Sequence, residues 1–520
     1  MKQSKTESDR QSGVLGKNTF INFMGQAIPL VFALLAIPFV ISGLGTERFG
    51  ILMTIWVVTG YFSLFDMGLG RATTKFVADQ DAESESGSTD IIITSILLLL
   101  GIGFLGSLII VLMTPLLVNS ILNIPEELIL ESERSFYILS LSIPFVLASM
   151  GARGVLEARQ RFGIVNAVKI PASLINYVGP LPVLLFSNSL VPLVSLLIVA
   201  RIITFFIYLY FSLREEKQIS LTQVAYVEWG KKLISFGAWL TVSNLISPIM
   251  SYMDRFIVGA ILTMTAVTYY TTPYEVVSRL WIIPGSFMAV MFPAFSVYAS
   301  GDKEKFSIMF NSSIRYLLVV MTPMVVVILI GSETLLNLWL GTEFAENSAI
   351  VLQLLAVGML INSLAMVPFS ALQAYGRPDI IAKIHMVELP VYLVMIWYFT
   401  IYFGIAGVAM AWTIRVTIDS ALIFYFFHKV IDIDRSQKIL RTKQMLFYLI
   451  AGVVGYLIYL QLQIGVGQIL FALTSGLLIF IVMWKLNLNQ TEKDRLKGLT
   501  KNLISSAKSF AEKDQKNGGK

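Results

Sequence analysis

The chain has 520 residues, of which 56% are hydrophobic and only 14% are charged, and its formal net charge is +6. Runs of about 20 apolar residues recur along the whole length, which excludes a soluble domain and predicts an all-α polytopic membrane protein. The absence of cysteine excludes disulfides and thiolate chemistry, and the two histidines are too few for a histidine-based metal site. The basic residues lie at the ends of the apolar runs, which indicates membrane topology and no nucleic-acid partner.

Hydropathy predicts fourteen membrane-spanning helices. Proline and glycine interrupt several of them, which membrane helices tolerate where neighbouring helices or water satisfy the backbone. In chain order the predicted spans are 18–42, 48–68, 91–118, 136–157, 163–186, 190–213, 232–261, 266–297, 309–331, 348–372, 379–402, 405–428, 445–462 and 464–484.

The basic residues orient these spans. When the N-terminus is placed inside, most of the 39 Lys and Arg residues fall in inside segments, and only Arg48 and Arg134 fall in outside loops. Because inside loops are enriched in basic residues, both termini are expected to be cytoplasmic. The outside loops are short, and the longest, 119–135, is acidic, so no outside domain is large enough to be an enzyme.

An internal repeat relates the first six spans to the next six. LEARQRFGIVNAVKI (156–170) aligns without a gap with LQAYGRPDIIAKIHM (372–386), and VARIITFFIYLYF (199–211) resembles TIRVTIDSALIFYF (413–426) at nearly the same separation. Six spans is an even number, so the two copies have the same orientation. Transporters built in this way bind substrate between the halves, near the midplane of the membrane.

The repeat predicts two six-helix lobes and two further helices. The expected parts are a cytoplasmic segment (1–15), an N-lobe (16–213), a cytoplasmic linker (214–231), a C-lobe (232–428), a second linker (429–444), spans 13 and 14 (445–485) and a cytoplasmic tail (486–520). The tail carries apolar residues at helical spacing together with lysines, which is typical of a helix on the membrane surface. A partly disordered tail is an equal alternative.

The repeat places Arg201 and Arg415 at the same depth, one in each lobe. Each lies ten or eleven residues from the outer end of its span, or about 16 Å at 1.5 Å per residue, near the centre of a ~30 Å hydrocarbon layer. An arginine at this depth is costly and is therefore a candidate for function. Arg415 has a structural alternative, because Asp419 lies one helical turn away and can pair with it.

Other ionisable and aromatic side chains in the spans complete the candidate site. Basic residues in a cavity suit an anion, the planar fork of arginine suits phosphate oxygens, and tyrosine rings can stack on sugars. The candidate substrate-binding residues are Arg201, Arg415, Lys169, His385, Arg255, Arg279, Tyr61 and Tyr274, and the candidates for proton or sodium coupling are Asp66, Asp254, Glu275, Glu388 and Asp419. Some have structural alternatives: Glu275 and Arg279 are one turn apart, and Lys169 can reach the cytoplasmic surface.

Three stretches resemble bacterial lipid-linked oligosaccharide flippases. GLGTERFGILMTIWVVTGYFSLFDMGLGRATTKFVAD (43–79) resembles their first helical pair, YMDRFIVGAILTMTAVTYYTTPYEVVSRL (252–280) the start of their second half, and AYGRPDIIAKI (374–384) the turn between their tenth and eleventh spans. The resemblance covers most of residues 15–485. It indicates the polysaccharide-export branch of the MOP superfamily more than its multidrug branch, and it implies a MATE-like fold of two six-helix lobes around a basic cavity.

The resemblance implies an activity without catalysis or cofactor. The chain would turn an undecaprenyl-pyrophosphate-linked oligosaccharide from the inner to the outer leaflet of the bacterial inner membrane by alternating access, for O-antigen or another surface polysaccharide. Membrane lipids, a polysaccharide polymerase and a chain-length regulator are the implied partners. Flipping carries negative charge outward, so we expect the membrane potential to drive it, at about 2.3 kcal/mol per charge per 100 mV. A proton or sodium gradient is the alternative driving force.

Other functions fit the sequence less well. A multidrug antiporter of the same superfamily binds organic cations and would need an acidic cavity, whereas several basic residues lie within the spans. A membrane glycosyltransferase, polymerase or ligase would need a sizeable outside loop. An ATP-driven exporter would carry GxxxxGK[ST], which the sequence lacks. A scaffolding protein would not need arginines at the midplane.

Overall fold

The computed structural model describes residues 28–64, 68–82, 88–214, 228–234, 250, 252–299, 301–431, 466–488 and 490. Within these ranges the chain forms helices joined by short turns and no strand, which confirms the predicted all-α protein. Several predicted features lie outside the described residues: Asp66, the span 445–462, most of the span 232–261 and nearly all of the tail.

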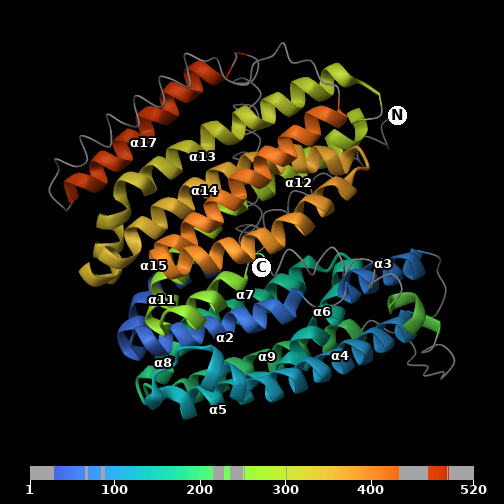
Figure 1. Cartoon of the computed structure of the whole chain (residues 1–520). Helices are drawn as coiled ribbons and strands as arrows, with labels where there is room; N and C mark the ends of the chain where they lie inside the picture. The colour runs from blue at the N-terminus through green and yellow to red at the C-terminus, as the bar shows by residue number, and fades with distance from the viewer. Residues whose placement is uncertain are drawn as a thin grey trace, which may run out of the picture. The chain divides into compact units, whose positions relative to one another are not determined.

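The helices follow the apolar runs of the sequence (Figure 1). They are α2 (Thr46–Leu64), α3 (Leu69–Ala82), α4 (Ser88–Leu116), η1 (Leu117–Ile121), η2 (Glu126–Leu128), α5 (Ile129–Ser140), α6 (Ile143–Ala158), α7 (Phe162–Val178), α8 (Pro180–Leu184), α9 (Leu190–Arg214), α11 (Met264–Ser278), η3 (Arg279–Trp281), α12 (Ile282–Ala299), α13 (Lys303–Leu340), α14 (Thr342–Ala374), α15 (Pro378–Val430) and α17 (Val466–Asn487). Three unlabelled helical segments of the described residues are Ile28–Leu44, residues 228–234 and residues 252–261.

Nine helices in the described part of the chain are long and apolar enough to cross a membrane. One of them, α15, covers two predicted spans, 379–402 and 405–428. Its backbone leaves the helical conformation between them, at Gly404, with φ 58° and ψ −142°. Glycine adopts this conformation without strain, so the chain passes from one span to the next without a loop. We refer to residues 378–403 as the first half of α15 and to residues 405–430 as the second half.

The helix α13 extends well beyond its predicted span. Its 38 residues measure about 57 Å at 1.5 Å per residue, which exceeds a ~30 Å hydrocarbon layer. Asp302 caps its N-terminus by accepting a hydrogen bond from the backbone N–H of Lys305 at 2.9 Å. This bond, together with the ammonium of Lys305, lowers the pKa of the Asp302 carboxyl below its usual 3.8.

The chain divides into two compact units. Unit 1 holds Met1–Thr272 and Leu389–Val408, and unit 2 holds Pro273–Glu388 and Ala409–Lys520. The lobe boundaries expected from the repeat stay a prediction. In unit 1, α6 packs against α3, α4 and α9. A Cβ on Gly103 of α4 would lie 2.3 Å from the Cα of Pro144 in α6, so a glycine is needed for this close approach.

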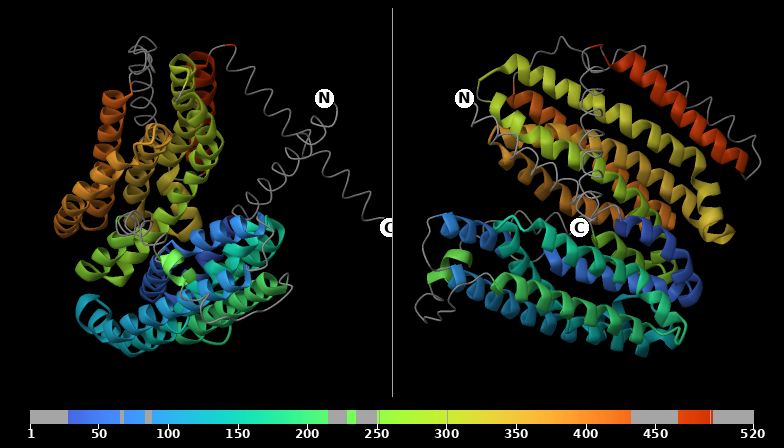
Figure 2. Two further views of the ribbon diagram at one scale, coloured as in Figure 1. Left: turned by 90° about the vertical axis from the view of Figure 1, so that its right-hand side faces the viewer. Right: turned by 180° about the vertical axis from the view of Figure 1, so that it is seen from behind.

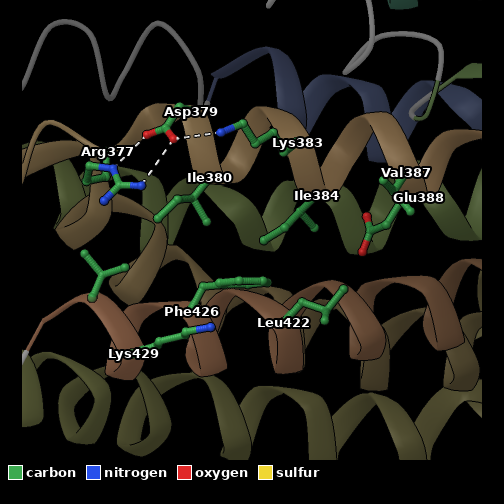
Figure 3. Close-up of a pocket in the computed structure, with 11 residues that line it drawn as sticks. Arg377, Asp379, Ile380, Lys383, Ile384, Val387, Glu388, Leu422, Phe426 and Lys429 are labelled. Carbon is green, nitrogen blue, oxygen red and sulfur yellow. Dashed lines mark hydrogen bonds and ion pairs between the residues drawn. The ribbon is translucent and has the colours of Figure 1, made fainter.

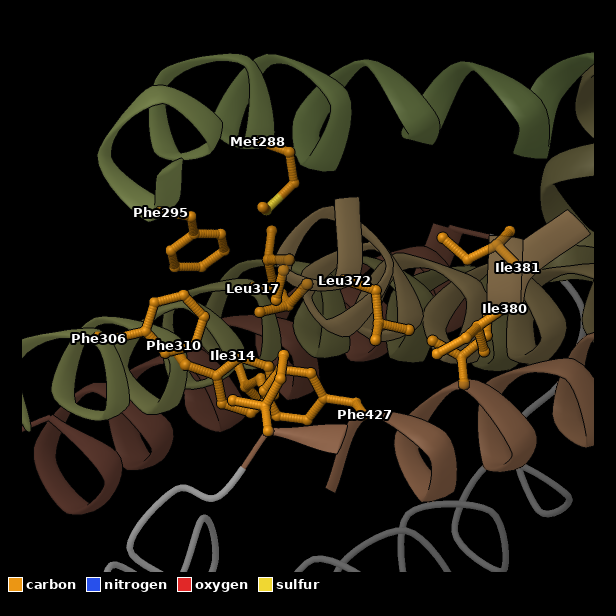
Figure 4. Packing of buried hydrophobic residues seen from close by; sticks show 14 of the residues in the cluster. Met288, Phe295, Phe306, Phe310, Ile314, Leu317, Leu372, Ile380, Ile381 and Phe427 are labelled. Atoms are coloured by element: carbon orange, nitrogen blue, oxygen red, sulfur yellow. The ribbon is translucent and has the colours of Figure 1, made fainter. Parts of the chain in front are cut away.

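In unit 2, α13 packs against α14 on one side and α17 on the other (Figures 1 and 2). A buried apolar cluster joins α12, α13 and α14 to both halves of α15 (Figure 4). Within it, the rings of Phe310 and Phe427 stack with their centroids 4.2 Å apart. Ile380 and Ile384 of the first half of α15 belong to the same cluster. This packing fixes both halves of α15 and thereby the side chains that they carry.

Candidate transport site

Four ionisable side chains meet between the two halves of α15. His385 and Glu388 come from the first half, and Arg415 and Asp419 from the second. The guanidinium of Arg415 lies 3.9 Å from the carboxylate of Glu388, and Nε2 of His385 lies 3.4 Å from Oδ1 of Asp419. The spacings i,i+3 and i,i+4 put each pair on one face of its helix, so the two faces can oppose one another. We call these four residues the α15 cluster.

The α15 cluster is buried. The side chains of Glu388, Asp419 and Arg415 are 7%, 11% and 12% exposed, and that of His385 is 24% exposed. Both carboxylate oxygens of Glu388 and one of Asp419 accept no hydrogen bond from the described residues. Buried carboxylates without hydrogen bonds are costly, so this arrangement needs a neighbouring positive charge.

The charges of the α15 cluster do not balance when the histidine is neutral. Two carboxylates then face one guanidinium, which leaves one negative charge. The candidate ligand atoms of His385, Glu388 and Asp419 lie within 4.8 Å of one another, which is close enough for one cation to contact all three. A proton or a monovalent cation would neutralise the cluster. The expectation that the chain binds no metal stays a prediction.

Arg201 has a different environment in unit 1. It lies at the middle of α9, eleven residues after Leu190. Its Nη1 donates hydrogen bonds to the hydroxyls of Thr59, at 3.1 Å, and Ser142, at 3.3 Å. Within the described residues these neutral hydroxyls are its hydrogen-bond partners, and no carboxylate of that part pairs with it. No carboxylate of the described residues therefore compensates the charge of this guanidinium, which has further N–H donors for an anion.

A second buried acid and base lie in unit 1, in residues 252–261. Asp254 is fully buried and accepts a hydrogen bond from the hydroxyl of Tyr270 at 2.6 Å. Arg255 is 2% exposed, and its guanidinium lies 5.3 Å from the centre of the Tyr252 ring. These contacts place both residues in the packed interior of unit 1, and a role for either in transport stays a prediction.

The remaining candidates are spread over several helices. Glu275 and Arg279 form the i,i+4 ion pair that their spacing allows, at 2.9 Å. The ring of Tyr274 packs edge-on against Trp412, with the centroids 6.1 Å apart. Lys169 is an exposed residue of α7. Tyr61 lies near the end of α2. Their roles in binding stay predictions.

Sequence reasoning missed the partners that hold the two arginines aligned by the repeat. Thr59 and Ser142 contact Arg201 but were not candidates, because hydroxyl residues are common in membrane helices and nothing in their spacing marks these two. Glu388 was a candidate, but its pairing with Arg415 was not foreseen. In the gapless alignment of 156–170 with 372–386, Lys169 falls on His385. Among the described residues His385 lies in a charged cluster with Arg415, whereas no ion pair joins Lys169 to Arg201.

Comparison with known proteins assigns the family. The family described as "Polysaccharide biosynthesis protein" matches residues 15–299. A Shigella flexneri protein named "Putative O-antigen transporter" is 33% identical over 417 residues, which cover 80% of this chain and 98% of that protein. The chain belongs to the polysaccharide biosynthesis protein family. It is therefore a multi-pass membrane protein of surface polysaccharide biosynthesis, as the resemblance of residues 43–79 and 252–280 implied.

Solved structures confirm the fold of this family member. The lipid II flippase MurJ in an inward closed conformation is similar with a TM-score of 0.69 at 14% identity, over 90% of this chain and 97% of that one. An inward-facing multidrug resistance MATE transporter of the MOP superfamily is similar with a TM-score of 0.66 at 16% identity, over 78% and 94%. At these identities the likeness concerns the fold alone. It confirms the predicted multi-span architecture.

Proposed function

We propose that the chain flips a polyprenyl-pyrophosphate-linked oligosaccharide from the cytoplasmic to the outer leaflet of the bacterial inner membrane. The observation that carries this proposal is the 33% identity to the Shigella protein along 98% of that protein's length. Both termini are cytoplasmic in this proposal, as the distribution of basic residues predicts. The polymerase and the chain-length regulator are proposed partners.

Arg201 is the proposed ligand of the pyrophosphate. Its mid-helix position in α9 and its neutral hydroxyl partners support this role. An arginine that is not paired with a carboxylate of the described residues can form an ion pair with a phosphate. Thr59 and Ser142 hold one end of the guanidinium and leave its other N–H groups for the substrate. The sugars of the substrate cross the membrane along a hydrated path beside Arg201. Moving their hydroxyls from water into lipid without new hydrogen bonds would cost too much free energy.

The α15 cluster is the proposed coupling site. Its uncompensated negative charge and its buried Glu388 support the binding of one proton or one sodium ion per transport cycle. Arg415 then serves as the counter-charge of Glu388 and not as a substrate ligand. The α15 cluster is preferred over Asp254, whose carboxylate already accepts the Tyr270 hydroxyl, and over Glu275, which is paired with Arg279.

A flipping assay tests the substrate. Purified protein is reconstituted in liposomes with a fluorescent polyprenyl-pyrophosphate oligosaccharide, and the protected fraction of the label is followed after a membrane-impermeant quencher is added. Arg201→Ala should slow flipping by about 10- to 150-fold, which is the loss expected for one charge-assisted hydrogen bond of ~1.5–3 kcal/mol. Arg201→Lys should restore part of the rate. Arg134→Ala, an exposed arginine outside the spans, is the matched control and should leave it unchanged.

The same liposomes test the coupling and the rival substrate. An imposed proton or sodium gradient should change the flipping rate of the wild type, and Glu388→Gln should abolish that response while Glu275→Gln retains it. If folded wild-type protein does not move the glycolipid but takes up organic cations, the multidrug alternative replaces the proposal. If neither gradient changes the rate, the α15 cluster is a structural feature and coupling is absent.

A further inference from the structure

A groove of about 590 Å³ opens between the two halves of α15 (Figure 3). Figure 3 shows Ile380 and Ile384 of the first half facing Phe426 and Leu422 of the second half. The charged residues that line the groove gather at one end, near residue 377, except for Glu388, which lies at the other. All of the residues that line this groove belong to unit 2.

The walls of the groove are apolar and fixed in place. Ile380 and Ile384 are buried and are held by the apolar cluster of unit 2. Val387, by contrast, is 71% exposed, and Val430 is 37% exposed. The walls are therefore rigid at their base and exposed at their edge, which is the form of a binding groove for an apolar chain.

The mouth of the groove carries a net positive charge. Asp379 pairs with Arg377 at 2.9 Å and with Lys383 at 3.2 Å. Lys429 comes from the second half of α15 and forms no ion pair with the described residues. Three cations and one carboxylate leave a charge of about +2 at the mouth. The segment 374–378 that leads into it is a turn that the distribution of basic residues places on the cytoplasmic side.

We propose that this groove binds an anionic glycerophospholipid of the cytoplasmic leaflet. The phosphate of the headgroup contacts Lys383, Lys429 and Arg377, and an acyl chain lies between Ile380, Ile384 and Phe426. Basic pockets between membrane helices on the cytoplasmic side bind anionic lipid headgroups in this way. The carboxylate of Glu388 does not repel the phosphate at the mouth of the groove. Glu388 comes nine residues after Asp379, a mouth residue, and nine residues span about 13 Å along a helix.

The chemistry of the lining favours a phospholipid over the transported glycolipid. An oligosaccharide has many hydroxyls that each need a hydrogen-bond partner. Beyond the charged mouth, the residues that line this groove are apolar up to Glu388. A glycerophospholipid needs only a charged mouth and an apolar wall, and both are present. This site is separate from Arg201, so the proposal does not depend on the identity of the substrate.

Lipid retention tests the proposal. The full chain is delipidated in mild detergent, titrated with phosphatidylglycerol or with phosphatidylcholine of the same acyl chains, and examined by native mass spectrometry. Wild type should bind phosphatidylglycerol more tightly than phosphatidylcholine. The double variant K383A/K429A should bind phosphatidylglycerol about 30-fold more weakly, at ~1 kcal/mol per basic residue. K303A/K305A, which removes two lysines at the start of α13, is the matched control and should bind as wild type does.

A second variant tests the apolar wall. Val387→Trp changes an exposed side chain and should weaken binding of both lipids by filling the groove, without altering the thermal unfolding of the protein. Equal affinity of wild type for the two lipids, or no effect of K383A/K429A, would overturn the proposal. So would a polyprenyl phosphate that displaces phosphatidylglycerol from the wild type, since the groove would then be a substrate site. Wild type that binds neither lipid also overturns it.

Discussion

The buried pair of Arg415 and Glu388 permits a quantitative prediction about the stability of the α15 cluster. At the observed separation of 3.9 Å, the Coulomb attraction is about 4 kcal/mol at an effective dielectric constant of ~20. Removing one partner of a buried pair costs ~3–5 kcal/mol, because the other charge stays buried without compensation. Replacing both partners by apolar residues costs less than the sum of the two single changes.

The two single variants should differ from each other. Arg415→Met leaves the carboxylates of Glu388 and Asp419 within 4.8 Å of each other, with His385 as the remaining member of the α15 cluster. Glu388→Met leaves one guanidinium and one carboxylate, which balance. Arg415→Met should therefore be the more destabilising of the two, and the coupling free energy between the changes should be about 2–4 kcal/mol.

The assay is equilibrium unfolding in mixed micelles with increasing SDS, followed by circular dichroism, on wild type, both single variants and the double variant. The control is the same cycle on Lys232 and Glu228, an i,i+4 pair at 2.7 Å whose side chains are 48% and 65% exposed. An exposed pair should give a coupling of less than about 1 kcal/mol. If the buried pair couples no more strongly than this exposed pair, the electrostatic account of the α15 cluster is wrong.

Three further predictions concern topology, the turn in α15 and a helix cap. Because the chain has no cysteine, Glu127→Cys should react with an impermeant maleimide in intact cells, whereas Lys303→Cys should react only after permeabilisation. Gly404→Ala should destabilise the protein by about 1–3 kcal/mol in the SDS assay through backbone strain, whereas Gly101→Ala, at a helical position with equal space, should not. Asp302→Ala should lower the unfolding midpoint at pH 7. Since the folded-state pKa of Asp302 is lowered, this difference should vanish as the pH falls through that pKa below 3.8.

The positions of the spans could be predicted because lipid leaves a backbone few alternatives. An apolar run in a membrane satisfies its N–H and C=O groups within a helix, so α9 (Leu190–Arg214) lies where hydropathy placed the span 190–213. The ends of α13 could not be predicted in the same way. Charged residues near its two ends, at Lys303–Lys305 and at Glu333, interrupt the apolar run, which hydropathy interprets as the end of a span. The backbone nevertheless continues its helical hydrogen bonds from Lys303 to Leu340.

The candidate site shows a similar division between local and distant contacts. The pair Glu275–Arg279 could be predicted because both residues lie on one helical face, one turn apart. For Arg415 the same rule offered Asp419, whereas the structure pairs it with Glu388 on the other half of α15. That contact depends on the change of direction at Gly404, which sequence spacing does not encode.

The two arginines that the repeat aligns have different electrostatic surroundings, and this difference separates their roles. Arg415 contributes to a cluster that already lacks one positive charge, so giving its guanidinium to a phosphate would leave two buried carboxylates uncompensated. Arg201 has only hydroxyl partners within the described residues and loses little when it binds an anion. A repeat that began with equivalent arginines is therefore expected to have specialised, with Arg201 binding the anionic substrate and Arg415 holding the carboxylates whose protonation or sodium binding accompanies transport.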